Sequence, residues 1–190
     1  MERRDILKAS AIFLGYGLVG GTSVAVLNGC KADTSSEWKP SFFTKSEIDL
    51  LAEVSERIIP KTDTPGAKDA LVHRYLDEAV TYNFEEDEKT MIKEGIKVFD
   101  ALGHSKYGKK FVELTPVEMD AVIQQTADDS KAAKAKGDDS PQIFHELRGM
   151  VVSGFFGSEI GATQALVYLP VPGPYQGCIP LSEVGGTYAL

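Results

Sequence analysis

Two helix-start signals of the same kind constrain this chain more than any other feature. A capping box, in which a Thr side chain and a Glu three residues later satisfy each other's backbone amides, occurs at Thr44–Glu47 and again at Thr115–Glu118. Apolar residues at helical spacing follow each box, and no comparable run alternates apolar and polar residues. A hydrophobic staple flanks each box, formed by Phe43 with Ile48 and by Leu114 with Met119. The sequence therefore predicts an all-α fold.

About five helices are expected, joined by turns. The first follows Thr44 and ends at Ile59-Pro60, because proline lacks a backbone donor and disfavours helix in the residue before it. Residues 62–67 form a turn-rich segment, after which Asp69 starts the second helix. The inward face of that helix is expected to hold Leu71, Val72, Tyr75, Leu76, Ala79 and Val80.

The third helix is expected from about Glu85 to Leu102. Its acidic first turn matches the positive end of the helix dipole, and Gly103 follows as a C-terminal cap. The fourth helix begins after Thr115, and residues 128–139 beyond it are polar, as in a solvated loop or a frayed helix end. Ser140-Pro141 opens the fifth helix. Its apolar residues at helical spacing are Phe144, Leu147, Val151 and Phe155, with Phe156 beside them.

The last segment, residues 165–190, is of a different kind and is called the strap below. It is irregular, holding four of the nine prolines, several glycines and many aromatic or aliphatic side chains. A structureless segment of this length is uncommon in a compact domain, and one this apolar is poorly suited to free disorder. It needs a surface to lie on, either the chain's own helices or a partner subunit. The candidate partner contacts are Tyr168, Pro174, Tyr175 and Cys178.

Residues 1–29 have the order of an export signal. Arg3 and Arg4 precede a weakly apolar, glycine-bearing stretch, as in a twin-arginine signal. Leu27–Cys30 then resembles the lipobox at which bacterial signal peptidase cuts before a lipid-modified cysteine. Lipid attachment is therefore expected at Cys30, with residues 30–41 as a polar linker. The alternative is an uncleaved transmembrane anchor, because Ala9–Leu27 at ~1.5 Å per residue nearly crosses a ~30 Å hydrocarbon layer.

Either form of this segment predicts an exported, membrane-anchored protein whose domain, residues 42–190, faces the periplasmic side. After residue 30 the chain holds 17 basic and 26 acidic side chains, a net charge of −9, which does not attract the domain to anionic lipid headgroups, so attachment is expected to come from the lipid on Cys30. Which of the two bacterial membranes holds the lipid stays open. The twin-arginine route carries folded proteins, and its usual clients hold a cofactor, so a cofactor is expected in this chain or in a partner.

The chain shows little that is arranged for chemistry. With 20 Lys+Arg against 28 Asp+Glu and no basic stripe, it does not fit nucleic-acid binding, and two cysteines exclude a four-cysteine metal site. His73, His104 and His145 stand far apart, which favours polar surface or capping roles over metal binding. No nucleophile elbow, covalent haem motif or phosphate-cradling glycine loop occurs. No catalytic, cofactor-binding or metal-binding residue is therefore predicted, and a second polypeptide is expected to hold the cofactor.

Four segments resemble the gluconate 2-dehydrogenase subunit 3 family. They are Phe42–Thr44, Ile58–Ala67, Phe111–Pro116 and Pro172–Cys178. The similarity spans most of residues 42–180, and its most specific piece is Ile-Ile-Pro-Lys-Thr-Asp-Thr-Pro-Gly-Ala. The resemblance implies a small subunit of a membrane-associated, FAD-dependent dehydrogenase of gluconate, glucose or related sugars. In such complexes a large flavoprotein of the GMC type holds FAD and performs the hydride chemistry, and a cytochrome c subunit with haem c often takes the electrons.

The resemblance also implies a division of labour. The flavoprotein often lacks its own signal, so Arg3 and Arg4 would export the folded complex, Cys30 would anchor it, and the strap would dock the partner. A stand-alone, lipid-anchored periplasmic binding protein is the alternative from another class. Cys178 has no intramolecular partner once Cys30 is lipidated, which leaves burial as a free thiol or a disulfide to the flavoprotein.

Overall fold

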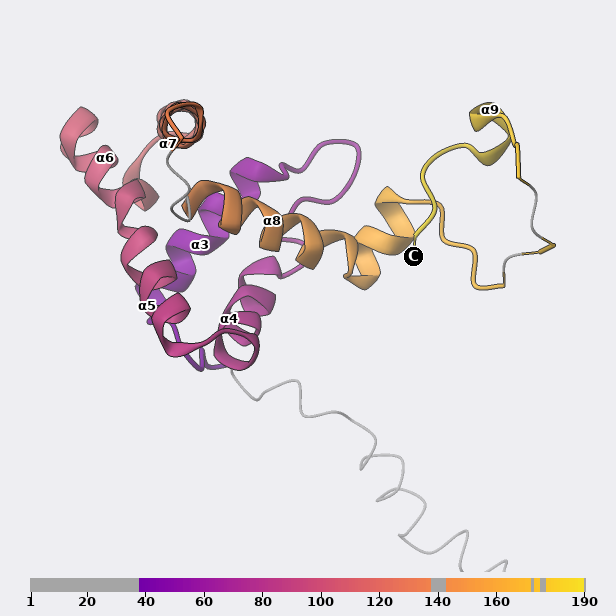
Figure 1. The fold of residues 1–190 in the computed structure, drawn as a ribbon, viewed down its shortest axis with the longest axis horizontal. Coiled ribbons are helices and arrows are strands. Elements are labelled where there is room, and N and C mark those ends of the chain that lie inside the picture. The colour runs from indigo at the N-terminus through magenta and orange to yellow at the C-terminus, as the bar shows by residue number, and fades with distance from the viewer. Residues whose placement is uncertain (1–37, 138–142, 172, 175–176, 190) are drawn as a thin grey trace, which may run out of the picture. The chain divides into compact units, whose positions relative to one another are not determined.

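The computed structural model describes residues 38–137, 143–171, 173–174 and 177–189 (Figure 1). The chain divides into two units, Met1–Lys39 and Pro40–Leu190, and every described helix belongs to the second. The elements of this unit, in chain order, are α3 (Lys45–Ile58), α4 (Val72–Asn83), α5 (Glu86–Gly95), α6 (Lys97–Tyr107), η1 (Phe111–Glu113), α7 (Pro116–Ala135), α8 (Ile143–Phe156), η2 (Gly161–Ala165) and α9 (Leu181–Val184). The described residues contain no strand, apart from an isolated bridge between Val167 and Tyr188. The predicted all-α fold is confirmed.

The core of the bundle lies around α3 and α8. Helix α3 packs against α4, α7 and α8, and α8 packs in turn against α4 and α7, while α6 covers α7 (Figure 1). The largest side chains that lose nearly all contact with solvent are Phe99, Phe111, Phe155, Leu51, Leu76, Ile92, Ile96 and Leu147. Burial of such side chains supplies most of the driving force for folding, so these elements form one self-contained core.

Both predicted capping boxes are present. The Thr44 amide donates to the Glu47 carboxylate at 2.8 Å, and the Glu47 amide donates back to the Thr44 hydroxyl at 3.4 Å. Thr115 and Glu118 repeat the same pair of hydrogen bonds at the start of α7. All four staple residues are buried. The two signals therefore fix the starts of α3 and α7, as the sequence predicts.

The second helix begins three residues later than expected. Helix α4 starts at Val72, because Leu71 has a left-handed backbone (φ 54°, ψ 34°) that breaks the helix before it. Asp69 does not cap α4; its carboxylate accepts the Gly66 amide at 3.2 Å. The predicted inward residues of α4 are buried except for Leu71 and Tyr75, each 44% exposed.

The expected third helix is two helices. The chain turns at Ile96, so α5 ends at Gly95 and α6 begins at Lys97. Ile92, Ile96 and Phe99 are all buried in the core, at the i, i+4 and i+7 spacing of one helix face that continues across the turn. Gly103, expected as the cap, is buried inside α6, and the cap is Gly108 with φ 70°.

The fourth and fifth helices depart from the sequence prediction mainly in length. Helix α7 continues to Ala135, so a solvated loop from residue 128 is wrong. Glutamine side chains one turn earlier donate to the Asp128 and Asp129 carboxylates at 3.0 and 2.8 Å, which supports the helix there. Ser140-Pro141 lies outside the described residues. In α8 the predicted residues Phe144, Leu147, Val151 and Phe155 are buried, whereas Phe156 is 39% exposed.

Candidate interaction site

The loop between α3 and α4 is built on one buried carboxylate. Glu56, in the last turn of α3, accepts the backbone amides of Lys61 at 3.0 Å and Lys68 at 2.9 Å. Gly66 lies so close that a Cβ at this position would overlap the Glu56 carboxylate. The Ala67 amide closes the loop on the Ile59 carbonyl at 3.0 Å. The loop is therefore held in one shape by groups of its own.

An ion pair and a hydrogen bond fasten the outer edge of the same loop. Lys61 Nζ lies 3.0 Å from the Asp69 carboxylate. The hydrogen bond from Lys61, followed by that from the Gly66 amide, lowers the pKa of Asp69 below its usual value. On the opposite side, Lys68 Nζ pairs with Glu53 at 2.5 Å. The loop accordingly presents residues 61–64 to solvent on a rigid base.

Helices α4 and α8, with Leu71 directly before α4, carry large apolar side chains that are partly exposed. The Tyr75 ring lies directly on Gly154, where a Cβ would collide with the ring, so the two helices approach closely here. Tyr75, Leu71, Val152 and Phe156 are each between 38% and 44% exposed. Each of these side chains is therefore available in part for contact with another molecule.

A tight turn after α8 starts the strap. The Ser158 hydroxyl donates to the Phe155 carbonyl at 2.6 Å and accepts the Gly161 amide at 3.0 Å. A Cβ at Gly161 would overlap the Phe155 carbonyl, so the π-helical turn η2 needs glycine at this position. The direction in which the strap leaves the bundle is therefore set by Ser158 and Gly161.

Two backbone hydrogen bonds join the beginning and the end of the strap. The Val167 amide donates to the Thr187 carbonyl at 2.9 Å, and the Ala189 amide donates to the Val167 carbonyl at 3.0 Å. Between these two points most of the described residues are exposed, including the candidate contacts Pro174 and Cys178. Its large exposed apolar side chains are Tyr168, Leu169, Val171, Ile179, Leu181 and Tyr188. The Cys178 thiol is thus not buried by the chain itself.

An open, mostly apolar pocket of about 460 Å³ lies where the strap returns to the end of α8. It is lined by Phe156, Gly157, Leu166, Thr187 and Tyr188. Its volume falls in the range of small-molecule sites, and its walls carry two aromatic rings. This feature could accept an apolar side chain or an apolar small molecule.

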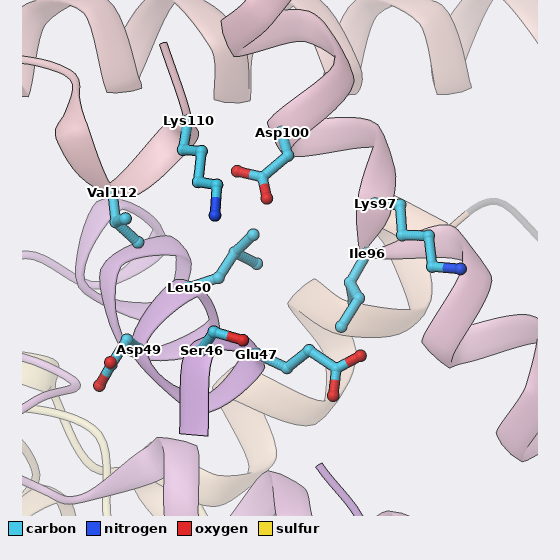
Figure 2. A pocket seen from close by; sticks show the side chains of 9 residues that line it. All are labelled: Ser46, Glu47, Asp49, Leu50, Ile96, Lys97, Asp100, Lys110 and Val112. Carbon is cyan, nitrogen blue, oxygen red and sulfur yellow. The ribbon is translucent and has the colours of Figure 1, made fainter. Parts of the chain in front are cut away.

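A second hollow, of about 160 Å³, lies between α3 and the α6–η1 region (Figure 2). The Lys110 and Asp100 side chains point into it above Leu50, whereas Lys97 points away. Lys97 is paired with Glu94 at 2.7 Å, and Asp100 accepts the Phe111 amide at 2.8 Å. The Asp100 carboxylate therefore holds η1 against α6. This structural role explains why a carboxylate lies in the hollow without any catalytic role.

The histidines are separated in the structure as they are in the sequence. His73 is half-buried on α4, and burial, followed by the charge of Arg74, lowers its pKa. His104 and His145 are exposed on α6 and α8. Among the described residues, no group of three or more His, Cys, Asp or Glu side chains is placed to hold a metal ion.

The remaining predicted site residues belong to segments that the structure does not describe. Arg3, Arg4, Cys30 and Tyr175 all lie outside the described residues. Across the described ranges, no helix has the length and apolar character needed to cross a membrane.

The comparison with known protein families supplies the identity that the geometry leaves open. A family model described as gluconate 2-dehydrogenase subunit 3 matches residues 45–173, more than half of the chain. The chain belongs to the gluconate 2-dehydrogenase subunit 3 family. No curated protein and no solved structure matches it. The family name makes this chain an accessory subunit of a dehydrogenase complex, which associates with the other subunits of that complex.

The four segments that carry the resemblance fall on different parts of the structure. Phe42–Thr44 leads into α3, Ile58–Ala67 contains the loop folded around Glu56, and Phe111–Pro116 is η1 with the start of α7. The tail segment Pro172–Cys178 lies in the strap, where its described residues are exposed. Three of the segments thus belong to the bundle, and the fourth is surface.

The sequence predictions did not include two buried carboxylates. Glu56 and Asp77 are at most 9% exposed, and each accepts backbone amides, Glu56 from the following loop and Asp77 from the residues that precede α3. Glu56 stands two residues after Val54, on another face of the helix, so the apolar pattern did not mark it. The partners of both carboxylates are backbone amides, which have no residue signature.

Proposed function

We propose that this subunit 3 chain exports, anchors and stabilises a large flavoprotein subunit of the GMC type, which oxidises gluconate, glucose or a related sugar with FAD. On this proposal the chain itself is non-catalytic, and a cytochrome c subunit with haem c takes the electrons where one is present. The observation that carries the docking role is the strap, which holds large apolar side chains in solvent. Val171 is 81% exposed and Tyr168 is 56% exposed, although the bundle beside them buries its own apolar residues.

The composition of the strap suits docking. Prolines limit the conformations of the free segment, so ordering it against a partner costs less than ordering a glycine-rich chain. Aromatic side chains such as Tyr168 bury a large area with few rotatable bonds. The partly exposed Tyr75 on α4 and Phe156 on α8 are further candidate contacts for the same partner.

Export and anchoring rest on the sequence. Arg3 and Arg4 form the export handle for the folded complex, and Cys30 carries the lipid that holds it on the periplasmic side of the membrane. A subunit that carries both signals allows the large subunit to fold and load FAD before export.

The first experiment is a mild-detergent purification of the full chain through a C-terminal tag on a flexible spacer. We expect a co-purifying large subunit with a flavin absorbance spectrum, identified by mass spectrometry. A protein that comes down alone and colourless from cells that express a neighbouring flavoprotein would overturn the subunit role.

A pair of variants tests the strap within the same experiment. Tyr168→Ala combined with Leu169→Ala is expected to reduce the yield of large subunit, because both side chains lie exposed on the strap. Val117→Ala is the matched control, since Val117 is 78% exposed but lies on α7. An equal loss of large subunit in the strap variant and in Val117→Ala would show that contacts made by the strap do not hold the large subunit.

Cys178 provides a sharper form of the docking proposal. The thiol is exposed, so an oxidising compartment allows it to form a disulfide with a partner cysteine. Non-reducing electrophoresis of the native complex should then show a band of the summed mass that disappears in Cys178→Ser. If no shifted band is found, the disulfide is excluded while the non-covalent contact stands.

One observation favours a second candidate function, a lipid-anchored periplasmic binding protein. The apolar pocket of about 460 Å³ beside Phe156 and Tyr188 has the size of a ligand site. If the chain purifies alone, co-purified small molecules extracted from it are the next measurement, with Phe156→Ala as the variant that should lose them.

A further inference from the structure

Asp77 on α4 binds the backbone at the start of the folded domain. Its Oδ2 accepts the Ser41 amide at 2.6 Å, and its Oδ1 accepts the Phe42 and Phe43 amides at 3.0 and 2.9 Å. Asp77 itself is fully buried. Three successive backbone amides that converge on one carboxylate form an anion-binding nest closed by a residue about 35 positions later in the chain.

Helix α5 also contacts the same three-residue segment, and α5 is in turn linked to α3. The Phe42 ring stacks edge-on against Phe43 and lies under Lys93 Nζ of α5, 4.9 Å from the ring centroid. Lys93 Nζ is also 3.8 Å from the Glu47 carboxylate of α3. Helices α3, α4 and α5 therefore meet at Ser41–Phe43, the leading segment.

The grip is not needed to start α3. The capping box of Thr44 and Glu47 already satisfies the first amides of that helix, and the amides bound by Asp77 precede the box. Burial of a carboxylate is costly unless hydrogen bonds compensate it. The three backbone amides that the Asp77 carboxylate accepts are all in the leading segment, so its role is to fix that segment to α4.

We propose that Asp77 is the fixed end of the membrane tether: a clasp that determines where the linker ends and the rigid bundle begins. This inference rests on the proposed lipid at Cys30. From Cys30 to Ser41 the backbone reaches at most ~40 Å at ~3.3–3.6 Å per residue. Release of the clasp would add Ser41–Phe43, roughly 10 Å, to the tether and would shift the pull on the domain from α4 to the first turn of α3.

The test uses the full-length, membrane-bound protein and follows the leading segment directly. In Asp77→Asn we expect the Ser41–Phe43 amides to exchange hydrogen at least about tenfold faster than in the unmodified chain, because a charged acceptor of three amides is lost. Amides in α8 should keep their rates. Glu78→Gln is the matched control, since Glu78 is the exposed neighbour on the same helix.

Chymotrypsin gives a second reading. Cleavage after Phe42 or Phe43 releases the domain with a new N-terminus that mass spectrometry identifies, and this cleavage should rise by a similar factor in Asp77→Asn. Ser41→Pro removes one of the three amides that Asp77 binds, at an exposed residue, and should raise both the exchange rates of the Phe42 and Phe43 amides and the cleavage rate without disturbing the core. This variant covers the case that Asp77→Asn fails to fold.

The Asp77 clasp and the lipid anchor on Cys30 are overturned by different results. A membrane-bound chain in which Asp77→Asn and Ser41→Pro both leave exchange and cleavage unchanged would overturn the clasp. A chain that stays in the aqueous phase of a detergent partition would overturn the lipid anchor, and the tether with it, whatever the amides do.

Discussion

The bundle and the strap of this one chain solve the burial of apolar side chains in opposite ways. In the bundle, side chains such as Phe99 and Leu51 have lost nearly all contact with solvent, and buried carboxylates hold backbone amides. In the strap, Tyr168 and Val171 remain in solvent, and two hydrogen bonds through Val167 close a long excursion. The bundle is thus complete by itself, whereas the apolar surface of the strap is available for another molecule.

The contrast has an energetic basis. Burial of one large apolar side chain stabilises a fold by about 1.5–3 kcal/mol, and the bundle gains this at every core position. The strap gains little from its own exposed residues and must still order its backbone, at about 1–2 kcal/mol per residue. Glycine at position 161 and the Ser158 hydroxyl define the boundary between the two regimes.

Matched truncations in the two regions give the largest expected difference. Phe99→Ala should lower the free energy of unfolding by about 3–5 kcal/mol, because Phe99 is fully buried. Tyr168→Ala should change it by less than about 0.5 kcal/mol, because its side chain is exposed. Urea unfolding of the full chain in mild detergent measures both. A comparable loss in Tyr168→Ala would show that the strap is part of the core.

The loop carboxylate gives the next largest effect. Glu56→Ala leaves the Lys61 and Lys68 amides without their acceptor and should cost about 2–3 kcal/mol. Glu56→Gln keeps one acceptor oxygen and should lose less. Glu78→Ala, at an exposed position, is the control and should lie within about 0.5 kcal/mol of the unmodified chain. Equal unfolding midpoints in Glu56→Ala and Glu78→Ala would contradict the role assigned to the loop.

The sequence predicted the parts of the fold that depend on local signals. The capping boxes at Thr44 and Thr115 and the apolar face of α8 need only neighbouring residues, and the structure confirms them. The starts of α4 and α6 were not predicted. Leu71 takes a left-handed backbone at the end of the loop that folds onto Glu56, and the chain turns at Ile96 although Ile92, Ile96 and Phe99 keep the spacing of a single helix face. Local patterns do not contain that information.

The candidate interaction site also has one part that the sequence predicted, the strap, and one part that it did not, the Asp77 clasp. Composition alone marked residues 165–190 as unusual, and the structure finds Tyr168, Pro174 and Cys178 exposed there. The Asp77 clasp was missed because its partners are backbone amides, which have no residue signature. Family resemblance identified the subunit before any geometry did, and the match to residues 45–173 confirms it.

A helix cap provides a smaller test within the bundle. Thr115→Ala should cost about 1 kcal/mol, because the Thr115 hydroxyl accepts the Glu118 amide at the start of α7. The Thr115 amide and hydroxyl both donate to Glu118 and lower its pKa. Because the pKa of Glu118 is lower in the folded chain, the ionised carboxylate stabilises the fold at pH values above the pKa of the unfolded chain. This stabilisation is lost as the pH falls through the pKa of the folded chain. Loss of the hydroxyl should raise the pKa of Glu118 partway towards its usual value in an NMR titration, whereas Val117→Ala should leave it unchanged.

The smallest expected effect is a pH dependence that belongs to the bundle and not to the strap. Burial lowers the pKa of His73, so below about pH 6.5 the unfolded chain binds a proton that the folded chain resists. The contribution of His73 to stability is therefore present above that pH and is lost as pH falls towards the folded pKa. His73→Gln should flatten the urea midpoint between pH 8 and pH 5 relative to His145→Gln, whose histidine is exposed on α8. The strap contains no histidine, so the protection factors of its amides, which correct for the intrinsic effect of pH on exchange, should stay constant over this pH range. A loss of protection in the strap over the same range would show that its packing is coupled to α4.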